Sequence, residues 1–354
     1  MRIASVAPAF SRPHEDVGPH SDVRSGDPPS GGYLYDERVA AELRALGHTV
    51  DEIFVAEGAL FDAAAIAQRL ATYDAVLEDE LAFAVHAPVN AILQAEGKST
   101  KRVAVVHVPE ALLDASGATL DAERAFLRSV HAAIFVSRTT RDDTEALLGR
   151  HTPSFVATPG RDHFPDVLAR AEGPFHIVAV GHVHPHKATL DLALALRAFS
   201  GLAKGAWRAT IAGDEAIDPA YTASVNGALG AAREHVAFVG RRARTDIAAL
   251  LGGAHVFLTA APYESYGIAA AEALACGVPV VGCAHGGFRE IVRDRDTGLL
   301  ADPGQPAALA QALAVLIGDD GLRADLAKRA RAASATLPTW RATANEVARV
   351  VAGA

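Results

Sequence analysis

The chain has 354 residues, half of them hydrophobic, and a formal net charge of −9. This length is typical of two globular domains, and because no run of about 18 apolar residues occurs, we expect no membrane-spanning helix. Residues 1–165 hold 15 Lys and Arg against 24 Asp and Glu, whereas the rest of the chain holds 18 of each, so the acidic first half argues against nucleic acids and anionic membranes as partners.

The first half of the chain alternates short apolar runs with helical patterns. The N-terminal stretch MRIASVAPAF predicts a first strand rather than a secretory signal, since it has one positive charge and a proline inside a short apolar run. A helix is expected over 34–46, ended by Gly47, and residues 11–30 predict a mobile loop rich in Pro and Gly. Strands are expected over 3–6, 50–55, 74–77, 103–106 and 133–136. This alternation predicts a parallel sheet.

A second series of the same kind follows a crossing segment at 159–174. Strands are expected over 176–180, 209–212, 236–239, 256–259 and 278–282, with helices between them and further helices over 307–317, 321–333 and 337–354. We therefore place one domain at 1–168 and another at 169–336. The two cysteines, Cys276 and Cys283, stand in apolar surroundings and predict small buried side chains, which fits a reducing cytoplasm.

The stretch 262–290, PYESYGIAAAEALACGVPVVGCAHGGFRE, carries the strongest functional pattern. Glu264 stands in a loop, and Glu272 stands eight positions later inside an apolar helix expected over 268–275. A helix N-terminus favours an anion, and its first amides are free to bind one; here these are the amides of Gly267, Ile268 and Ala269. Glu272 is suited to accept hydrogen bonds from ligand hydroxyls. The alternative is that Glu264 caps the helix and Glu272 is solvated, but the helix around Glu272 carries no other charge.

The order Glu, seven residues, Glu, followed by GVPVV and GG, resembles the retaining nucleotide-sugar glycosyltransferases of family 4. The resemblance implies an α/β protein of the GT-B fold, in which two Rossmann-like domains face each other with their parallel sheets across a cleft. It implies an acceptor-side domain at 1–168, a nucleotide-sugar-binding domain at 169–336, and a helix at 337–354 that returns to the first domain. The donor would be linked to UDP or GDP, and the chemistry would need neither metal nor cofactor.

The resemblance also assigns residues that face the donor diphosphate. Gly31 and Gly32 open the first helix, where the family has a donor-facing loop; the alternative is a plain helix-start turn. At the start of the second domain, Gly181 and Lys187 match the family's pattern, and the resemblance implies that Lys187 is a ligand of the donor phosphates. His182 stands where the family has Arg, and Ala188 replaces a Gly. A His offers one donor and is mostly neutral at pH 7.

His182, His184 and His186 alternate, which is also the pattern of a metal-chelating loop. The family resemblance implies the opposite, because Lys side chains and backbone amides do the work of a metal there. We therefore expect no metal at this loop.

Polar residues end two strands of the first domain. His107 closes the strand at 103–106 and resembles the family's histidine near the reacting sugar; the alternative is a hydrogen-bonded core histidine. Glu78, Asp79 and Glu80 close another strand. They are candidates for binding a hydroxylated or cationic acceptor, and the alternative is a solvated turn.

The sequence thus predicts a retaining glycosyltransferase that moves a sugar from a nucleotide donor to a small, soluble, hydroxylated acceptor. The residues expected to act in catalysis are His107, Glu264 and Lys187. One alternative is a GT-B enzyme of another reaction type, such as a nucleotide-sugar epimerase, while a phosphorylase is disfavoured by the short chain. A different class of protein, a non-catalytic nucleotide-sugar sensor, is favoured by His182 and disfavoured by the intact Glu264, Glu272 and Lys187.

Overall fold

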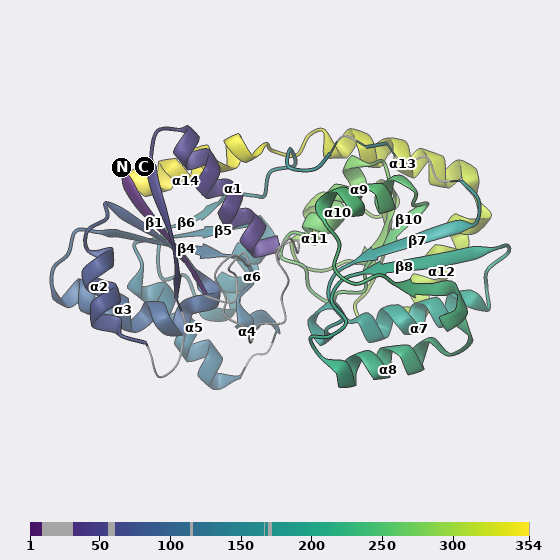
Figure 1. Cartoon of the computed structure of the whole chain (residues 1–354), viewed down its shortest axis with the longest axis horizontal. Helices are drawn as coiled ribbons and strands as arrows, with labels where there is room; N and C mark the ends of the chain where they lie inside the picture. Colours follow the sequence, from purple (N-terminus) through teal and green to yellow (C-terminus); the bar gives the residue numbers. More distant parts are fainter. Residues whose placement is uncertain (9–30, 56–60, 114–115, 166, 169–171, 354) are drawn as a thin grey trace. The chain divides into compact units, whose positions relative to one another are not determined.

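The computed structural model describes residues 1–8, 31–55, 61–113, 116–165, 167–168 and 172–353. These residues form two compact units: the first comprises the described residues up to Gly160 together with those from Pro338 onward, and the second comprises those from Arg161 to Leu337 (Figure 1). The loop predicted at 11–30 lies outside the described residues. None of the described helices combines the length and the apolar character needed to cross a membrane.

The first unit is built on a parallel sheet with the strand order β2-β1-β3-β4-β5-β6. Its strands are β1 (Arg2–Pro8), β2 (Thr49–Val55), β3 (Ala75–Asp79), β4 (Lys101–Val106), β5 (Ala132–Phe135) and β6 (Ser154–Val156). The inner strands β3, β4 and β5 are buried along nearly their whole length, as expected where helices cover both faces of a sheet. β3 is buried along its whole length, so any polar residue at its end enters the protein interior.

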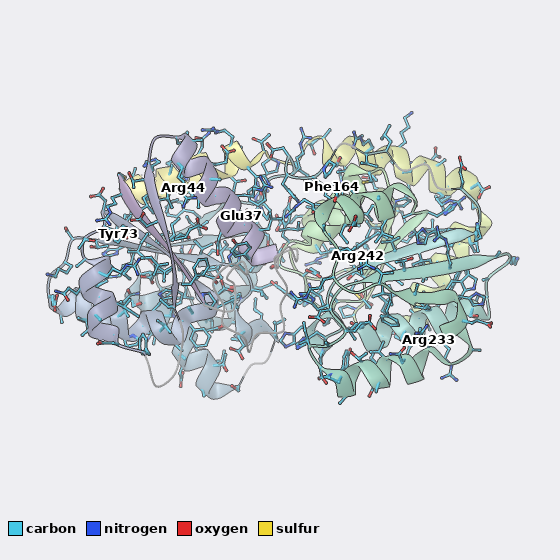
Figure 2. All side chains as sticks on the ribbon, viewed as in Figure 1. Glu37, Arg44, Tyr73, Phe164, Arg233 and Arg242 are labelled. Atoms are coloured by element: carbon cyan, nitrogen blue, oxygen red, sulfur yellow. The ribbon has the colours of Figure 1, made fainter. Side chains whose placement is uncertain are left out.

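The helices of the first unit alternate with these strands (Figure 1). They are α1 (Gly31–Ala45), α2 (Ala63–Leu70), α3 (Phe83–Ala95), α4 (Glu110–Leu113), α5 (Gly117–Ser129) and α6 (Arg138–Leu148), with a short 3-10 turn at Glu80–Ala82. Arg44, in the last turn of α1, donates to the carbonyl of Val50 at 3.1 and 2.8 Å and so ties α1 to β2 (Figure 2). Tyr73 donates to Asp51 of β2 at 2.8 Å and so ties the segment before β3 to this edge strand.

The C-terminal helix α14 (Trp340–Ala352) packs on the first unit although it follows the second in sequence. Its Thr343 donates to the carbonyl of Thr158 at 2.6 Å, and the Trp340 ring lies edge-on to Tyr35 with a centroid distance of 5.8 Å. A Cβ at Gly160 would lie 2.3 Å from the backbone nitrogen of Trp340, so only glycine permits this approach.

The second unit has its own parallel sheet, with the order β12-β11-β10-β7-β8-β9. Its strands are β7 (Phe175–Val180), β8 (Trp207–Ala212), β9 (Val236–Phe238), β10 (Val256–Leu258), β11 (Val280–Cys283) and β12 (Gly298–Ala301). Its helices are α7 (Thr189–Ser200), α8 (Pro219–Leu229), α9 (Arg244–Gly252), α10 (Ile268–Ala275), α11 (Phe288–Ile291), α12 (Pro306–Gly318) and α13 (Asp320–Ser334). Helices α7, α8 and α12 bury one face of this sheet in a common apolar core (Figure 1).

The predicted fold class is confirmed: the chain is an α/β protein with two parallel sheets. The strands missed from sequence are β6 and β12, two short edge strands of three and four residues. Both cysteines are free and buried, as predicted. The predicted helix at 268–275 coincides with α10, since Gly267 begins it and Gly277, with φ of 73°, follows its end.

Candidate functional site

Lys187 and Glu264 meet at the carboxyl ends of the second sheet, where parallel α/β sheets bind ligands. Lys187 closes a 3-10 turn between β7 and α7, and Glu264 stands in the loop between β10 and α10. The Nζ of Lys187 donates to Oε1 of Glu264 at 2.7 Å. The Lys187 side chain is 43% exposed and that of Glu264 is 19% exposed, so a ligand in solvent can reach both.

Glycines allow the backbone to approach closely around this pair. Gly286 has φ of 67°, and a Cβ there would lie 2.4 Å from the carbonyl oxygen of Glu264, which forms a bridge with Gly286. A Cβ on Gly213 would lie 1.9 Å from the carbonyl oxygen of Gly181. The loops that carry Lys187 and Glu264 are therefore held by close contacts that only glycine permits.

The N-cap of α10, Gly267, lies three residues after Glu264. Gly267 caps the helix with φ of 92°, and the first intrahelical hydrogen bond runs from the amide of Ala271 to the carbonyl of Gly267. The amides of Ile268 and Ala269 precede this bond, so they have no helical carbonyl to bind. Both residues are partly exposed. This end of the helix is suited to an anion.

Glu272 lies on α10 and is buried, with 8% of its surface exposed. Its Oε1 lies 2.9 Å from Nε2 of His163 and 3.6 Å from Nη1 of Arg244, the first residue of α9. Thus Glu272 is not a solvated helix position, and the alternative interpretation given above is wrong for it. Its carboxylate is instead held by His163, from the segment before β7, and by Arg244, from the start of α9.

His182 follows Gly181 but turns toward the end of β8. Its Nδ1 accepts a hydrogen bond from the amide of Asp214 at 3.2 Å, and Asp214 in turn accepts two from Arg241, at 2.9 and 2.7 Å. Burial lowers the pKa of His182 below 6.5, and the charge of Arg241 lowers it further. His182 is therefore neutral at pH 7, and the fixed positive charge beside it belongs to Arg241.

The alternating histidines do not form a metal-binding group among the residues that the structure describes. His184 Nδ1 accepts from the amide of His186 at 3.3 Å, and the two rings meet edge to face at 4.8 Å. Within the described ranges, three potential ligand atoms converge at a different place, on Asp36, Asp79 and His107 of the first unit.

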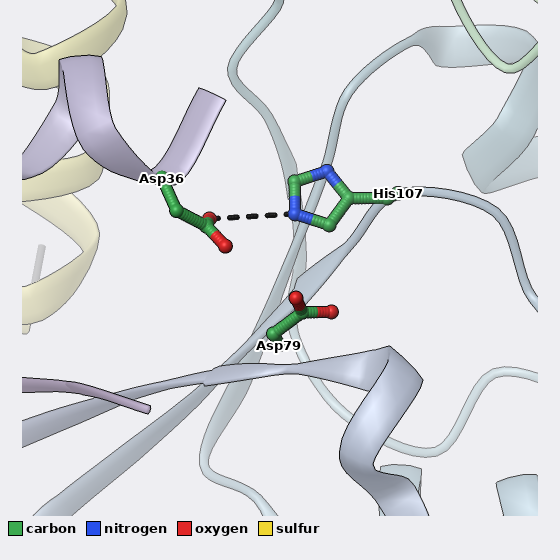
Figure 3. A group of neighbouring side chains, drawn as sticks. All are labelled: Asp36, Asp79 and His107. Atoms are coloured by element: carbon green, nitrogen blue, oxygen red, sulfur yellow. Dashed lines mark ion pairs between the residues drawn. The ribbon is translucent and has the colours of Figure 1, made fainter. Parts of the chain in front are cut away.

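His107 sits at the end of β4 and is buried, with 6% of its surface exposed. Its Nε2 lies 3.3 Å from Oδ1 of Asp36 on α1 (Figure 3). Burial lowers the pKa of His107, but the charges of Asp36, Asp79 and Glu80 outweigh it and raise the pKa to about 10. The imidazole is thus a buried cation held by carboxylates.

The three acids at the end of β3 exclude the alternative interpretation given for them, because they do not form a solvated turn. Glu78, Asp79 and Glu80 are all buried, with exposures of 0%, 3% and 3%. Glu78 accepts from Asn90 at 2.8 Å on α3, and burial raises its pKa to about 8. A carboxyl so enclosed does not face an acceptor, so the structure does not support that role for Glu78.

The other two acids organise the end of β4. Both oxygens of Glu80 accept backbone hydrogen bonds, from His107 at 2.6 Å and from Val108 at 2.8 Å. Asp79 accepts from the amide of Leu81 at 2.9 Å and so starts the 3-10 turn after β3. Burial raises the pKa of both carboxyls. The hydrogen bonds of Glu80 position the backbone at His107, and that of Asp79 positions the turn after β3.

Gly31 and Gly32 begin α1 in the first unit. A Cβ on Gly32 would lie 3.4 Å from the His107 ring, so the small residue lets the helix start pack against that ring. The residues before Gly31 lie outside the described ranges. The donor-facing role of this helix start stays a prediction.

Sequence reasoning missed four partners of the predicted residues: His163 and Arg244 on Glu272, Asp214 beside His182, and Asp36 on His107. All four lie far along the chain from the residue they contact. The one available signal was that Glu272 and His107 stand in apolar segments, where a charged group requires a partner. This pattern indicates that each charged side chain needs a partner, but it does not identify the partner residue.

Comparison with known proteins identifies the family through the second unit. Residues 160–333 match the family described as glycosyl transferases group 1. A D-inositol 3-phosphate glycosyltransferase of Xylanimonas cellulosilytica is 55% identical over 71 residues, which is 20% of this chain and 17% of that protein. One of Salinispora arenicola is 39% identical over 113 residues, 32% of this chain and 25% of that protein. These alignments span a quarter or less of the relatives' length.

Solved structures match over the whole chain. HepE of Anabaena, in a complex with UDP-glucose, has a TM-score of 0.80 at 18% identity and covers 100% of both chains. Sucrose-phosphate synthase from Thermosynechococcus elongatus has a TM-score of 0.79 at 19% identity and covers 99% of this chain and 98% of that one. At such identities the likeness shows the fold. The predicted family is confirmed for the second unit, since residues 160–333 match the group 1 glycosyltransferases, and the fold of the chain is GT-B.

Proposed function

We propose that this protein is a retaining glycosyltransferase that moves a sugar from a UDP- or GDP-linked donor to a small, hydroxylated acceptor. The observation that carries the proposal is the grouping in the second unit of Lys187, Glu264 and the N-terminus of α10, with Glu272 on the same helix. The relatives named as D-inositol 3-phosphate glycosyltransferases support a polyol acceptor, and the HepE complex supports a nucleotide-sugar donor.

The ion pair between Lys187 and Glu264 is proposed to open when the donor binds. An exposed pair of this kind contributes about 0–1 kcal/mol, so a diphosphate competes easily for the lysine. Lys187 and the amides of Gly267, Ile268 and Ala269 would then hold the diphosphate and stabilise its charge as it leaves. Glu264, released from the lysine, would accept hydrogen bonds from hydroxyls of the transferred sugar.

Glu272 is proposed to hold the ribose. His163 and Arg244 both contact its Oε1, which fixes the carboxylate in one orientation. The ribose hydroxyls would donate to Oε2. No side chain of the second-unit group is placed as a nucleophile, so we propose front-face attack in which the leaving phosphate takes the acceptor proton. In the first unit, His107 stays the residue predicted to serve the acceptor side.

The test is a donor and acceptor screen with stereochemical readout. The full chain is incubated with UDP- and GDP-sugars and with inositols and inositol phosphates as acceptors, in the presence of EDTA. Transfer with the donor's anomeric configuration, detected by NMR and unaffected by EDTA, is the expected result. Inverted product, or activity lost to EDTA and restored by Mg²⁺ or Mn²⁺, would contradict the proposed mechanism.

Two other outcomes correspond to the alternatives raised by the sequence. Conversion of one nucleotide sugar into another without an acceptor would identify an epimerase. Binding of nucleotide sugars without any turnover, across all acceptors, would identify a sensor.

A further inference from the structure

Two buried carboxylates hold the backbone of residues 107–111, the β4–α4 segment, which runs from the end of β4 into α4. Glu80 accepts the amides of the first two residues of this segment at 2.6 and 2.8 Å. Glu123, on α5, accepts the amides of the last two, the first at 2.6 Å and the second at 3.3 and 3.4 Å. The middle residue, Pro109, has no amide hydrogen. Every amide of the β4–α4 segment therefore donates to one of these two carboxylates.

Glu123 is buried, with 3% of its surface exposed, although it belongs to a helix that also has a solvated face. Burial raises the pKa of its carboxyl from 4.5 to about 7, and the two amides that it accepts oppose this rise. Burying a carboxylate is costly unless hydrogen bonds compensate it. Within the part of the chain that the structure describes, the carboxylate of Glu123 has hydrogen bonds only from the amides of Glu110 and Ala111. The buried charge is therefore directed at the backbone of the β4–α4 segment.

The path of the β4–α4 segment sets the place of the His107 imidazole, because His107 is its first residue. The ring lies edge-on to Tyr35 with a centroid distance of 5.3 Å, and its Nε2 lies 3.3 Å from Oδ1 of Asp36 (Figure 3). The pKa of His107 is raised to about 10 by the carboxylates around it. Since such an effect requires charges within about 4–6 Å, the pKa of His107 reports whether the ring keeps this place.

We propose that Glu123 is a positioning residue for His107. Glu80 fixes the near end of the β4–α4 segment and Glu123 fixes its far end, so that the imidazole stays beside Asp36. The consequence for catalysis rests on the proposed function, in which His107 serves the acceptor side. Loss of the Glu123 contacts would then slow the transfer step and leave donor binding by the second unit unchanged.

The test follows the His107 imidazole by NMR at increasing pH. The full chain is labelled with ¹³C at histidine, and the His107 signal is identified by its loss in His107→Gln. Glu123→Gln keeps nearly the same side-chain size and removes the charge that holds the two amides. Because nearby opposite charges shift a pKa by about 1–3 pH units, we expect the pKa of His107 to fall by at least about one pH unit. Glu96→Gln, at a side chain that is 53% exposed, is the matched control and should leave it unchanged.

A second variant, Glu123→Asp, separates position from charge. It keeps the negative charge but is shorter by one methylene, so its carboxylate no longer reaches both amides. If Glu123 acts by holding the β4–α4 segment, Glu123→Asp lowers the pKa of His107 as Glu123→Gln does. Amide hydrogen exchange of peptides covering residues 107–111 should also become faster in both variants, because the segment opens more readily.

Two outcomes would overturn the proposal: a pKa of His107 in Glu123→Gln equal to that of wild type, or a wild-type pKa in Glu123→Asp, which would show an effect of charge alone. Circular dichroism confirms the folding of each variant. If Glu123→Gln fails to fold, Glu123→Asp carries the test, since it keeps the charge.

The NMR measurement needs no substrate, so it separates this inference from the proposed function. With an acceptor found in the donor and acceptor screen, Glu123→Asp should lower kcat about 10–100-fold, as expected when a group beside the reacting atoms is misplaced. Its affinity for UDP- or GDP-sugars, measured by calorimetric titration, should equal that of wild type. A chain that transfers no sugar would overturn the proposed function, while the pKa of His107 would still decide whether Glu123 positions the imidazole.

Discussion

The carboxylates of the two units differ in their burial and in the cationic side chains that they contact. In the second unit each candidate carboxylate has a basic partner from another segment: Lys187 contacts Glu264, and His163 and Arg244 contact Glu272. In the first unit Asp79 and Glu80 are buried together, and burial raises the pKa of both carboxyls although the positive charge of His107 opposes that rise.

The two groups therefore differ in how easily a carboxylate can exchange its cationic partner. Lys187 is half-exposed and its partner Glu264 is partly exposed, so the lysine can exchange this carboxylate for a phosphate at a small cost in free energy. Buried carboxylates that have lost water keep whatever cation they have, because leaving one unpaired costs several kcal/mol. Under the proposed function, the Lys187–Glu264 pair of the second unit would open for an incoming ligand, whereas the buried carboxylates of the first unit would keep His107 as their cation.

The largest expected effect is that of Lys187→Ala in the second unit. Removing one preorganised donor from developing charge typically lowers turnover about 10²–10³-fold, and Lys187 is proposed to stabilise the leaving diphosphate. Steady-state kinetics with the donor varied should show the loss mainly in kcat. Lys204→Ala removes an exposed lysine of the same unit and is the control. Equal kcat values for the two variants would contradict the role.

Glu272→Ala should act on binding more than on turnover. A charged hydrogen bond contributes about 1.5–3 kcal/mol, so nucleotide affinity should fall about 10–100-fold while kcat at saturating donor changes less. Calorimetric titration with UDP and GDP measures this. Glu234→Ala, at a side chain that is 76% exposed, should leave affinity unchanged. If Glu272→Ala also leaves it unchanged, Glu272 is a structural partner of His163 and Arg244 only.

The burial of Glu78 in the first unit is tested by the pH dependence of stability. The pKa of Glu78 is raised by burial from 4.5 to about 8, so the folded state keeps a proton that the unfolded chain loses. Stability is therefore highest, for this group, below pH 4.5 and falls as the pH rises to about 8. Each pKa unit corresponds to about 1.4 kcal/mol.

Glu78→Gln should remove that fall. The melting temperature of wild type should drop relative to the variant between pH 5 and pH 8.5, by several degrees. Glu96→Gln, at a side chain 53% exposed, serves as the control and should follow wild type. Parallel pH curves for wild type and Glu78→Gln would show that Glu78 is not a buried acid with a raised pKa.

His182 should give the smallest effect. Because its pKa lies below 6.5 and its Nδ1 accepts from Asp214, donor affinity of wild type should not rise as the pH falls from 8 to 6. His182→Arg would lose that acceptor and place a second charge near Arg241, so we expect affinity to fall a few-fold at both pH values. If wild type binds the donor more tightly at pH 6 than at pH 8, and His182→Arg abolishes this gain in affinity, then His182 contacts the diphosphate.

The sequence predicted the features that depend on local, periodic patterns, namely helices and most strands. The helix at 268–275 was predicted to the residue because Gly267 and Gly277 bound an apolar segment, and most strands followed from β-branched runs. The short edge strands β6 and β12 gave no such run. The partners His163, Arg244 and Asp36 were missed because tertiary packing sets them, and a sequence pattern records no distance between loops. Similarly, the acids at 78–80 look solvated in sequence, and only the sheet around β3 buries them.

The central claim is that the second unit binds the nucleotide sugar and that the first-unit carboxylates do not. Calorimetric titration of UDP-glucose and other UDP- and GDP-sugars into three proteins tests it: wild type, the double variant Lys187→Ala with Glu272→Ala, and the double variant Asp36→Asn with Asp79→Asn. We predict one-to-one binding of at least one nucleotide sugar by wild type and by the first-unit variant, and a loss of affinity of at least tenfold in the second-unit variant. No binding of any nucleotide sugar by wild type, or equal affinity in the second-unit variant, would contradict the account.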